Sequence, residues 1–121
     1  MSELQHDERN DVVIVRFNHQ TIIANTVIEK VGNELLALVD RVDRKLLLDF
    51  KGVTHMSSAM IGKVLLLHKN CESAKVRLKL CNIHPQIIEA FTSTGLSKVL
   101  SIHSTEADAL TAFRKKRWLP W

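Results

Sequence analysis

The stretch Leu46–Leu67 constrains the fold of this chain more than any other. It opens with a predicted strand, Leu46–Phe50, whose uninterrupted leucines are typical of a strand covered on both faces, as in parallel sheets. A short loop leads to Ser57 and Ser58. Serine is favoured at helix starts because its hydroxyl accepts a hydrogen bond from an otherwise unpaired amide of the first turn. The stretch therefore predicts a buried strand, a loop, and a helix that opens at two serines.

The segments before this stretch predict two strands and a long helix. Dense β-branched residues favour a strand over Val12–Phe17, with a short strand near Leu4 and a turn over residues 7–11 before it. A helix is predicted over Asn25–Val42, because apolar residues recur there at alternating spacings of three and four. This apolar stripe consists of Ile28, Val31, Leu35, Leu38 and Val42.

The segments after it continue the alternation of strand and helix. The predicted elements are a strand over Val76–Leu80, a helix that starts at Pro85 and stops at Gly95, a strand over Val99–Ile102, and a last helix capped by Ser104 or Thr105. Arg77 and Lys79 alternate with apolar residues in the first of these strands. That alternation predicts a face open to solvent or a position at the edge of the sheet.

Strand and helix alternate along the whole chain, which predicts an α/β fold with a mainly parallel sheet of 4–5 strands and about four helices. The 121 residues suit a single domain over 1–121, with its core in 12–113 and a basic, tryptophan-containing tail over 114–121.

Composition and charge narrow the classes of function. The chain has ordinary globular values of 45% hydrophobic and 25% charged residues, with two cysteines, a polar N-terminus and no apolar run of membrane-spanning length. These features predict a soluble cytoplasmic protein that does not associate with membranes. Much of the net charge of +4 lies in 114–117, after a predicted helix, where cations favour the negative helix end. Direct binding of nucleic acid is therefore not expected.

The residues alone leave several readings of the loop open. In one interpretation the two serines only cap the helix. In the other, one of them carries a phosphate, whose negative charge the positive end of the helix would stabilise. A hydrolase triad could be formed by Asp49, His55 and Ser57. However, the sequence lacks the motif of the strained nucleophile elbow that such enzymes have.

A histidine follows each of four predicted strands. The spacing between Cys81 and His84 is compatible with zinc binding. The candidate ligands are His19, His55, His84, His103 and Cys81. Loops rarely converge within bond length of one ion, so no metal and no cofactor are predicted.

Three segments of the chain resemble the STAS domain, the fold of anti-sigma-factor antagonists. They are LLLDFKGVTHMSSAMIG, LKLCNIHPQIIEAF and TGLSKVLSIHSTEADAL, and the resemblance runs from Val12 to Phe113. Family members typically show a hydrophobic strand that ends in Asp, then a turn of the form V-T-x-x-D-S-S-G-L. When the two serines are aligned, Met56 stands in place of the acid and Ala59 in place of the glycine, with one residue fewer between Thr54 and Met56 than the pattern has.

The resemblance implies a non-enzymatic, cytoplasmic partner-switching regulator that binds an anti-sigma factor with serine-kinase character. In the family the second serine of the turn accepts the phosphate, which corresponds to Ser58, with Ser57 as the other candidate. Phosphorylation there would release the partner. The expected docking surface consists of Thr54, His55, Met56, Ser57, Ser58, Ala59 and Met60. The alternative is a STAS module in a larger complex that docks by the same surface without phosphorylation.

Overall fold

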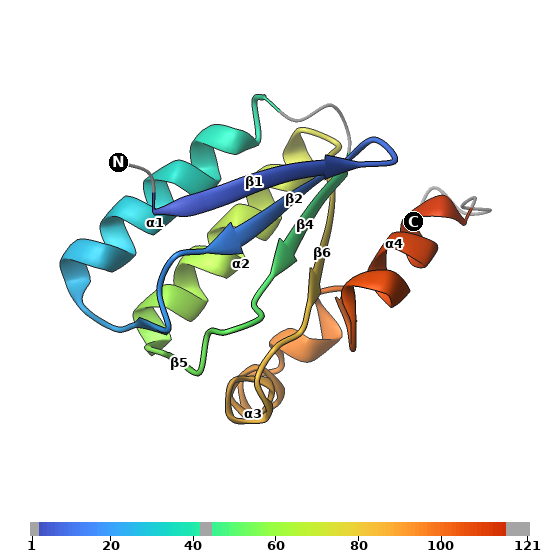
Figure 1. The fold of residues 1–121 in the computed structure, drawn as a ribbon. Helices are drawn as coiled ribbons and strands as arrows, with labels where there is room; N and C mark the ends of the chain where they lie inside the picture. The colour runs from blue at the N-terminus through green and yellow to red at the C-terminus, as the bar shows by residue number, and fades with distance from the viewer. Residues whose placement is uncertain (1–2, 42–44, 116–121) are drawn as a thin grey trace.

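A computed structural model describes residues 3–41 and 45–115. A five-stranded sheet lies at its centre, in the order β1-β2-β4-β6-β7, and only β1 runs antiparallel to its neighbour. The strands of this sheet are β1 (Leu4–Arg9), β2 (Val12–Phe17), β4 (Lys45–Asp49), β6 (Arg77–Cys81) and β7 (Ile102–His103). The helices are α1 (Asn25–Leu38), α2 (Ser58–Ser73), α3 (Pro85–Ser93) and α4 (Glu106–Arg114), and a short 3₁₀ helix spans Leu96–Lys98. The predicted α/β class and the mainly parallel sheet are confirmed (Figure 1).

Strands β1 and β2 form a hairpin joined by two residues. Asn10 and Asp11 both have positive φ, 51° and 69°. Arg9 pairs with Val12 across the hairpin, so the connection is the tight two-residue turn whose twist suits antiparallel strands. The predicted turn over residues 7–11 was wrong in its first half, because β1 continues to Arg9.

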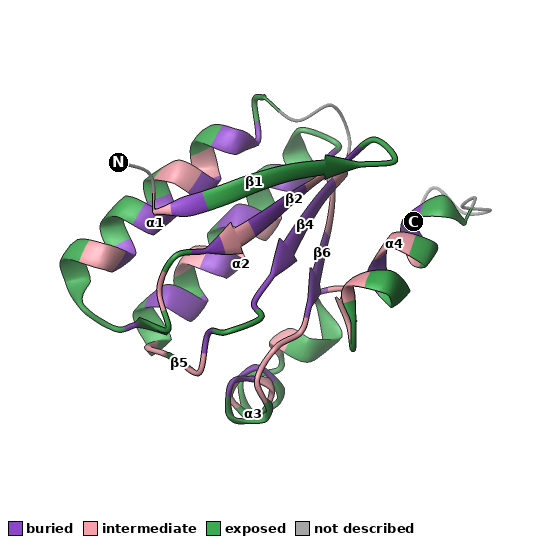
Figure 2. Ribbon diagram, viewed as in Figure 1, coloured by how far each residue is buried: buried purple, intermediate pink, exposed green. Residues whose placement is uncertain are grey.

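The leucines of β4 are buried on both faces of the sheet, as predicted. Leu46 and Leu48 belong to the larger core cluster, which includes the inner residues of α1, α2 and α3. Leu47 points the other way, into a smaller cluster with Ala109 and Phe113 of α4. Helices therefore cover the sheet on both sides, with α1 and α2 packed together on one face (Figures 1 and 2).

Two elements end or begin several residues from the positions that the sequence predicts. Helix α1 ends at Leu38, so the predicted stripe is confirmed from Ile28 to Leu38, and Val42 lies outside the described residues. The predicted strand over Val99–Ile102 is displaced. The Val99 amide donates to the Leu96 carbonyl at 3.0 Å in the 3₁₀ turn, and β7 begins only at Ile102.

The predicted edge position of the strand over 76–80 holds for part of its length, because β7 pairs only with Leu80 and Cys81. The alternative prediction, a face open to solvent, was wrong. Strand β6 lies between β4 and β7, and Lys79 is 7% exposed. Helix α4 covers its polar face, where the Lys79 ammonium lies 5.4 Å and the Arg77 guanidinium 5.3 Å from the centre of the Phe113 ring. Aromatic faces attract cations, which explains how two basic residues fit beneath a helix.

Two short strands that the sequence did not predict make a second sheet. They are β3 (Thr21–Ile22) and β5 (His55–Met56), which pair in parallel. Their pairing ties the segment before α1 to the segment before α2. Within the described residues, no helix is both long enough and apolar enough to cross a membrane.

Candidate functional site

Strands β3 and β5 position the serine pair at the start of α2. The Thr54 amide donates to the Gln20 carbonyl at 2.8 Å, and the Ser57 amide donates to the Ile22 carbonyl at 3.1 Å. These bonds hold both ends of β5 against the neighbouring segment. The loop after β4 is thereby fixed, and the serines lie on a rigid support rather than on a free loop.

Ser57 and Ser58 have different roles at the helix start. Ser57 is the N-cap, with extended backbone, and its hydroxyl accepts a hydrogen bond from the Met60 amide at 3.4 Å. Ser58 is the first helical residue and is exposed. Within the described part of the chain no hydrogen bond engages the Ser58 hydroxyl, so this oxygen faces solvent at the positive end of the helix.

The electrostatic surroundings of Ser58 favour an added anion. The first turn of α2 contains no acidic residue, so nothing in that turn repels negative charge. Exposed His55 precedes the cap, and its Nδ1 lies 2.9 Å from the Thr54 hydroxyl. The backbone amides of a first helical turn, together with the helix dipole, bind phosphate groups in many proteins.

The structure divides the predicted docking residues into three groups. His55, Ser58 and Ala59 are exposed, and Thr54, Met56 and Ser57 are half-buried. Met60 is completely buried in the larger core cluster, so its side chain packs under the helix and is not on the surface. The docking surface that we consider below leaves out Met60.

One exposed apolar residue that the sequence did not indicate lies next to this predicted surface. Ile23 is 53% exposed, which is unusual for a large apolar side chain. Because Ile22 pairs with Met56, the next residue, Ile23, lies beside Ser57. Its position depends on the pairing of two very short strands, and no pattern in the sequence indicates that pairing.

A shallow hollow of about 410 Å³ opens at the same end of the sheet. Its lining comes from the loop after β4 and the loop between β6 and α3, and includes Lys51, Thr54, Asn82 and His84. The predicted docking surface is therefore not flat, and the hollow would have room for a side chain of a binding partner beside the serine loop.

The arrangement does not form the triad that was considered from the sequence. Asp49 is 1% exposed and accepts hydrogen bonds at 3.0 Å from both the Lys51 amide and the Asn82 side chain. Its other carboxylate oxygen lies 3.5 Å from Nε of Arg16. Asp49 thus anchors the loop from below, and no contact among the described residues links it to His55.

The four histidines considered as metal ligands each have a local partner instead. His19 contacts Glu3, His55 contacts Thr54, His84 caps α3, and His103 contacts Ser101. Burial raises the pKa of the Cys81 thiol to about 12, which opposes the thiolate form that zinc requires. In residues 3–41 and 45–115, no three His, Cys, Asp or Glu side chains are grouped so that they could hold one metal ion.

Comparison with known proteins identifies the family. The STAS domain family matches residues 3–109, and the chain belongs to that family. It is similar to BtrV of Bordetella bronchiseptica, whose name assigns it provisionally to the anti-sigma factor antagonists. The two are 28% identical over 95 residues, which cover 78% of this chain and 82% of BtrV.

Solved structures of anti-sigma factor antagonists share the fold. A STAS domain protein of this class from Planctomyces limnophilus has a TM-score of 0.85 and 23% identity, over 93% of this chain and 98% of that one. The phosphorylated form of the Bacillus cell fate determinant SpoIIAA has a TM-score of 0.69 and 19% identity, over 92% of this chain and 99% of that one.

Proposed function

We propose that this chain is an anti-sigma factor antagonist that binds an anti-sigma factor through the surface around Ser57 and Ser58. It acts by contact and not by catalysis. The observation that supports the proposal most is the exposed Ser58 hydroxyl at the first position of α2, on a loop that β3, β5 and Asp49 hold rigid.

Phosphorylation of Ser58 by a partner with serine-kinase activity would switch this binding. A phosphate adds about −1.5 to −2 charges at pH 7, and the first-turn amides can hold it without moving the loop. The same charge must lose its water when a partner closes over the surface. Such a penalty of about 2–5 kcal/mol weakens binding roughly 30-fold or more.

Met56 makes the recognition by the kinase specific to this chain. It occupies the position before the cap where the family usually has an acid, and it is half-buried against β3. An apolar side chain there replaces one negative charge with contact area. We therefore propose that the kinase partner contacts the exposed Ile23 near the acceptor serine, while Met56 packs against the core beneath β5.

The test uses three variants and a purified anti-sigma factor of the kinase class. Incubation with ATP should place one phosphate on Ser58, as mapped by mass spectrometry, and none on the Ser58→Ala variant. Ser58→Asp should lose partner binding in a titration. Ser73→Asp adds the same charge at the other end of the same helix and should bind as wild type does.

The alternative function is a fixed STAS interaction module. The capping role of Ser57 would serve that function equally well, because it holds the loop whether or not Ser58 is modified. Unchanged partner binding by Ser58→Asp, with no phosphate on Ser58 after incubation, would favour the fixed module over the switch.

The site of action that we propose is the cytoplasm. The two cysteines, Cys71 and Cys81, are unpaired and buried, and burial raises the pKa of each thiol to about 12. Free thiols of this kind are typical of reducing compartments.

A further inference from the structure

A second surface lies at the other end of α2, where part of the edge of β6 is open. Strand β7 pairs only with Leu80 and Cys81, so β6 extends beyond its neighbour on that side. The Leu80 amide donates to the Ser101 carbonyl at 2.9 Å, toward β7. Alternate residues of a parallel strand direct their main-chain groups to the same side, so the amide and carbonyl of Leu78 face this open edge.

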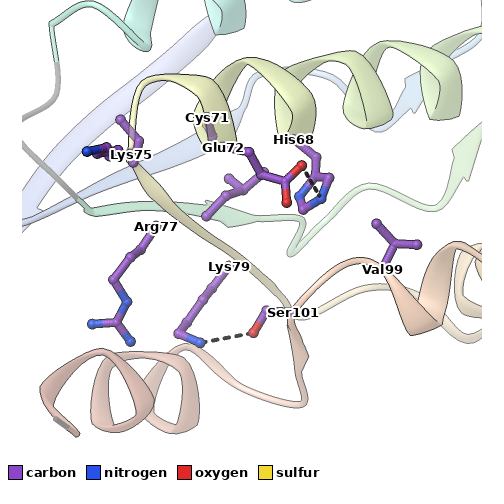
Figure 3. Close-up of a pocket in the computed structure, with 10 residues that line it drawn as sticks. His68, Cys71, Glu72, Lys75, Arg77, Lys79, Val99 and Ser101 are labelled. Carbon is purple, nitrogen blue, oxygen red and sulfur yellow. Dashed lines mark hydrogen bonds and ion pairs between the residues drawn. The ribbon is translucent and has the colours of Figure 1, made fainter. Parts of the chain in front are cut away.

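A cavity of about 220 Å³ follows the open edge (Figure 3). Its floor is the β6 stretch that includes Leu78, its walls are the end of α2 with Lys75 and the turn at Val99, and Ser101 closes one end. Val99 is 50% exposed and adds an apolar contact. The cavity is smaller than a typical cofactor pocket and fits a short length of extended chain.

The lining of the cavity is predominantly basic. Lys75, Arg77 and Lys79 contribute three cations, against one carboxylate, Glu72, which is 64% exposed and lies 3.5 Å from His68. The Lys79 ammonium, almost fully buried, donates to the Ser101 hydroxyl at 2.9 Å and therefore has a fixed position (Figure 3). The charges of these lining residues favour an anionic occupant over a cationic one.

We propose that the open edge of β6 binds an extended acidic segment of a partner protein, which adds a strand to the sheet. The two main-chain groups of Leu78 pair with the incoming strand. Because the faces of a strand alternate, acidic side chains on one face lie on the same side of the sheet as Arg77 and Lys79, and apolar side chains on the other face lie on the same side as Leu78.

This surface is separate from the serine pair. Helix α2 has 16 residues and is therefore about 24 Å long, with Ser58 at its first residue and the cavity at its last turn. The proposal does not depend on phosphorylation or on the identity of an anti-sigma factor. A partner held at this edge would leave the serine surface accessible.

The test titrates the ¹⁵N-labelled full chain with the peptide acetyl-Glu-Val-Glu-Val-Glu-amide. Saturable shifts are expected at the amides of Leu78, Val99 and Ser101, with none at Ser58. Two N-methylated peptides, methylated either on the valines or on the glutamates, each block one edge of the peptide strand. One of the two should lose binding, and equal binding by both would overturn strand addition.

Matched variants test the role of charge. Lys75→Asn removes a cation from the cavity at a left-handed position that asparagine tolerates, and should weaken binding about three- to tenfold. Lys69→Gln removes an exposed cation of α2 outside the cavity and should leave binding unchanged. Ser58→Asp should also bind as wild type does, which keeps this test independent of the proposed switch.

Three other results would overturn the proposal. Equal binding of the peptide Lys-Val-Lys-Val-Lys would show that charge does not select the occupant. Displacement of the acidic peptide by inorganic phosphate, with the same amide shifts, would assign the cavity to a small anion. Binding that appears only after removal of residues 116–121 would make the chain's own tail the occupant.

Discussion

Lys75 ends helix α2 in a backbone conformation that lysine rarely adopts. Its φ is 60°, in the left-handed region. The Val76 amide donates to the Cys71 carbonyl at 2.8 Å and the Lys75 amide to the Glu72 carbonyl at 3.2 Å, the pair of bonds that closes many helices. Glycine is the usual residue at this position because it has no Cβ to clash with the carbonyl.

The variant Lys75→Gly should therefore be more stable than wild type. We expect the free energy of unfolding to rise by about 1 kcal/mol, measured by urea denaturation. Lys69→Gly is the control, because Lys69 lies inside the same helix, where glycine costs about 1 kcal/mol. A loss of stability in both variants would contradict the strain at Lys75.

His103 should make the protein less stable in mild acid. Burial and, after it, the charge of Lys79 lower the pKa of His103 from its ordinary value of 6.5, although Asp108 opposes them. The unfolded chain therefore binds a proton at higher pH than the folded chain does. The free energy of unfolding should fall as the pH drops through 6.5 and below.

Two measurements check this prediction. An NMR titration should place the midpoint of the His103 ring below 6.5. Urea unfolding at several pH values should show a shallower acid loss in His103→Gln. A midpoint above 6.5 in the folded protein would reverse the sign and refute the prediction.

At this scale the sequence predicted the serine pair but not the division of roles within it. Both hydroxyls qualify as caps by residue type. Only the geometry shows that Ser57 bonds the Met60 amide and that Ser58 remains exposed. Met60 was placed on the docking surface for a similar reason, because a position next to a loop does not reveal which way a helical side chain points.

Helix α2 carries a glycine in the middle of its exposed face. Gly62 is exposed, and a Cβ built on it has no atom within 4 Å. Its presence lowers the helical propensity without relieving any crowding. Gly62→Ala should therefore stabilise the protein by about 0.5–1 kcal/mol, measured as a shift in the urea midpoint.

Gly52 provides the matched control for Gly62. It also has open space around its Cα, but its φ is 90°. Gly52→Ala should destabilise the protein because alanine is strained in that region. If both alanine variants lose stability, the open space around Gly62 does not determine the effect of Gly62→Ala on stability.

Long periodic elements were predictable, and short ones were not. The stripe in α1 and the apolar run in β4 each repeat often enough to indicate type and face. Strands β3 and β5 have two residues each, too few for any periodicity, yet they hold the serine loop. The segment at Val99 is rich in strand-forming residues, but its amide is already bonded within the 3₁₀ turn.

Across the whole molecule, Arg16 links strands and a helix that lie far apart in the sequence. Its guanidinium lies 3.7 Å from Asp7 of β1, 3.5 Å from Asp49 of β4 and 3.0 Å from Glu106 of α4. Burial lowers the pKa of Arg16, but the hydrogen bond and charge of Glu106, with smaller effects of Asp49 and Asp7, outweigh it and raise that pKa.

Asp49→Asn should weaken this link and the serine loop together. The variant keeps the size of a buried side chain but loses the charge that faces Arg16, so we expect a loss of about 1–3 kcal/mol in the free energy of unfolding. Asp7→Asn removes an exposed partner of the same arginine and should change stability by about 0.5 kcal/mol or less. Similar losses of stability in both variants would mean that the burial of Asp49 does not explain its contribution to the free energy of unfolding.

The leucines of β4 predicted that helices cover both faces of the sheet. They did not predict which helix covers which face. The alternation in β6 looked like a solvent-exposed face, because charged residues usually mark one. Phe113 and the carbonyls at the end of α4, to which Arg77 donates at 3.0 and 3.4 Å, make that face compatible with burial. These partners are more than thirty residues away, beyond the range of a local pattern.

The outermost strand, β1, has a consequence for the behaviour of the protein in concentrated solution. It is paired on one side only, and every residue after Leu4 is exposed, including Asp7, Glu8 and Arg9 (Figure 2). A strand so densely charged and hydrated is a poor template for pairing with a strand of another molecule, which is how fibres grow. The chain should consequently tolerate crowding and repeated warming with little turbidity, unless substitutions replace that charged rim with apolar side chains.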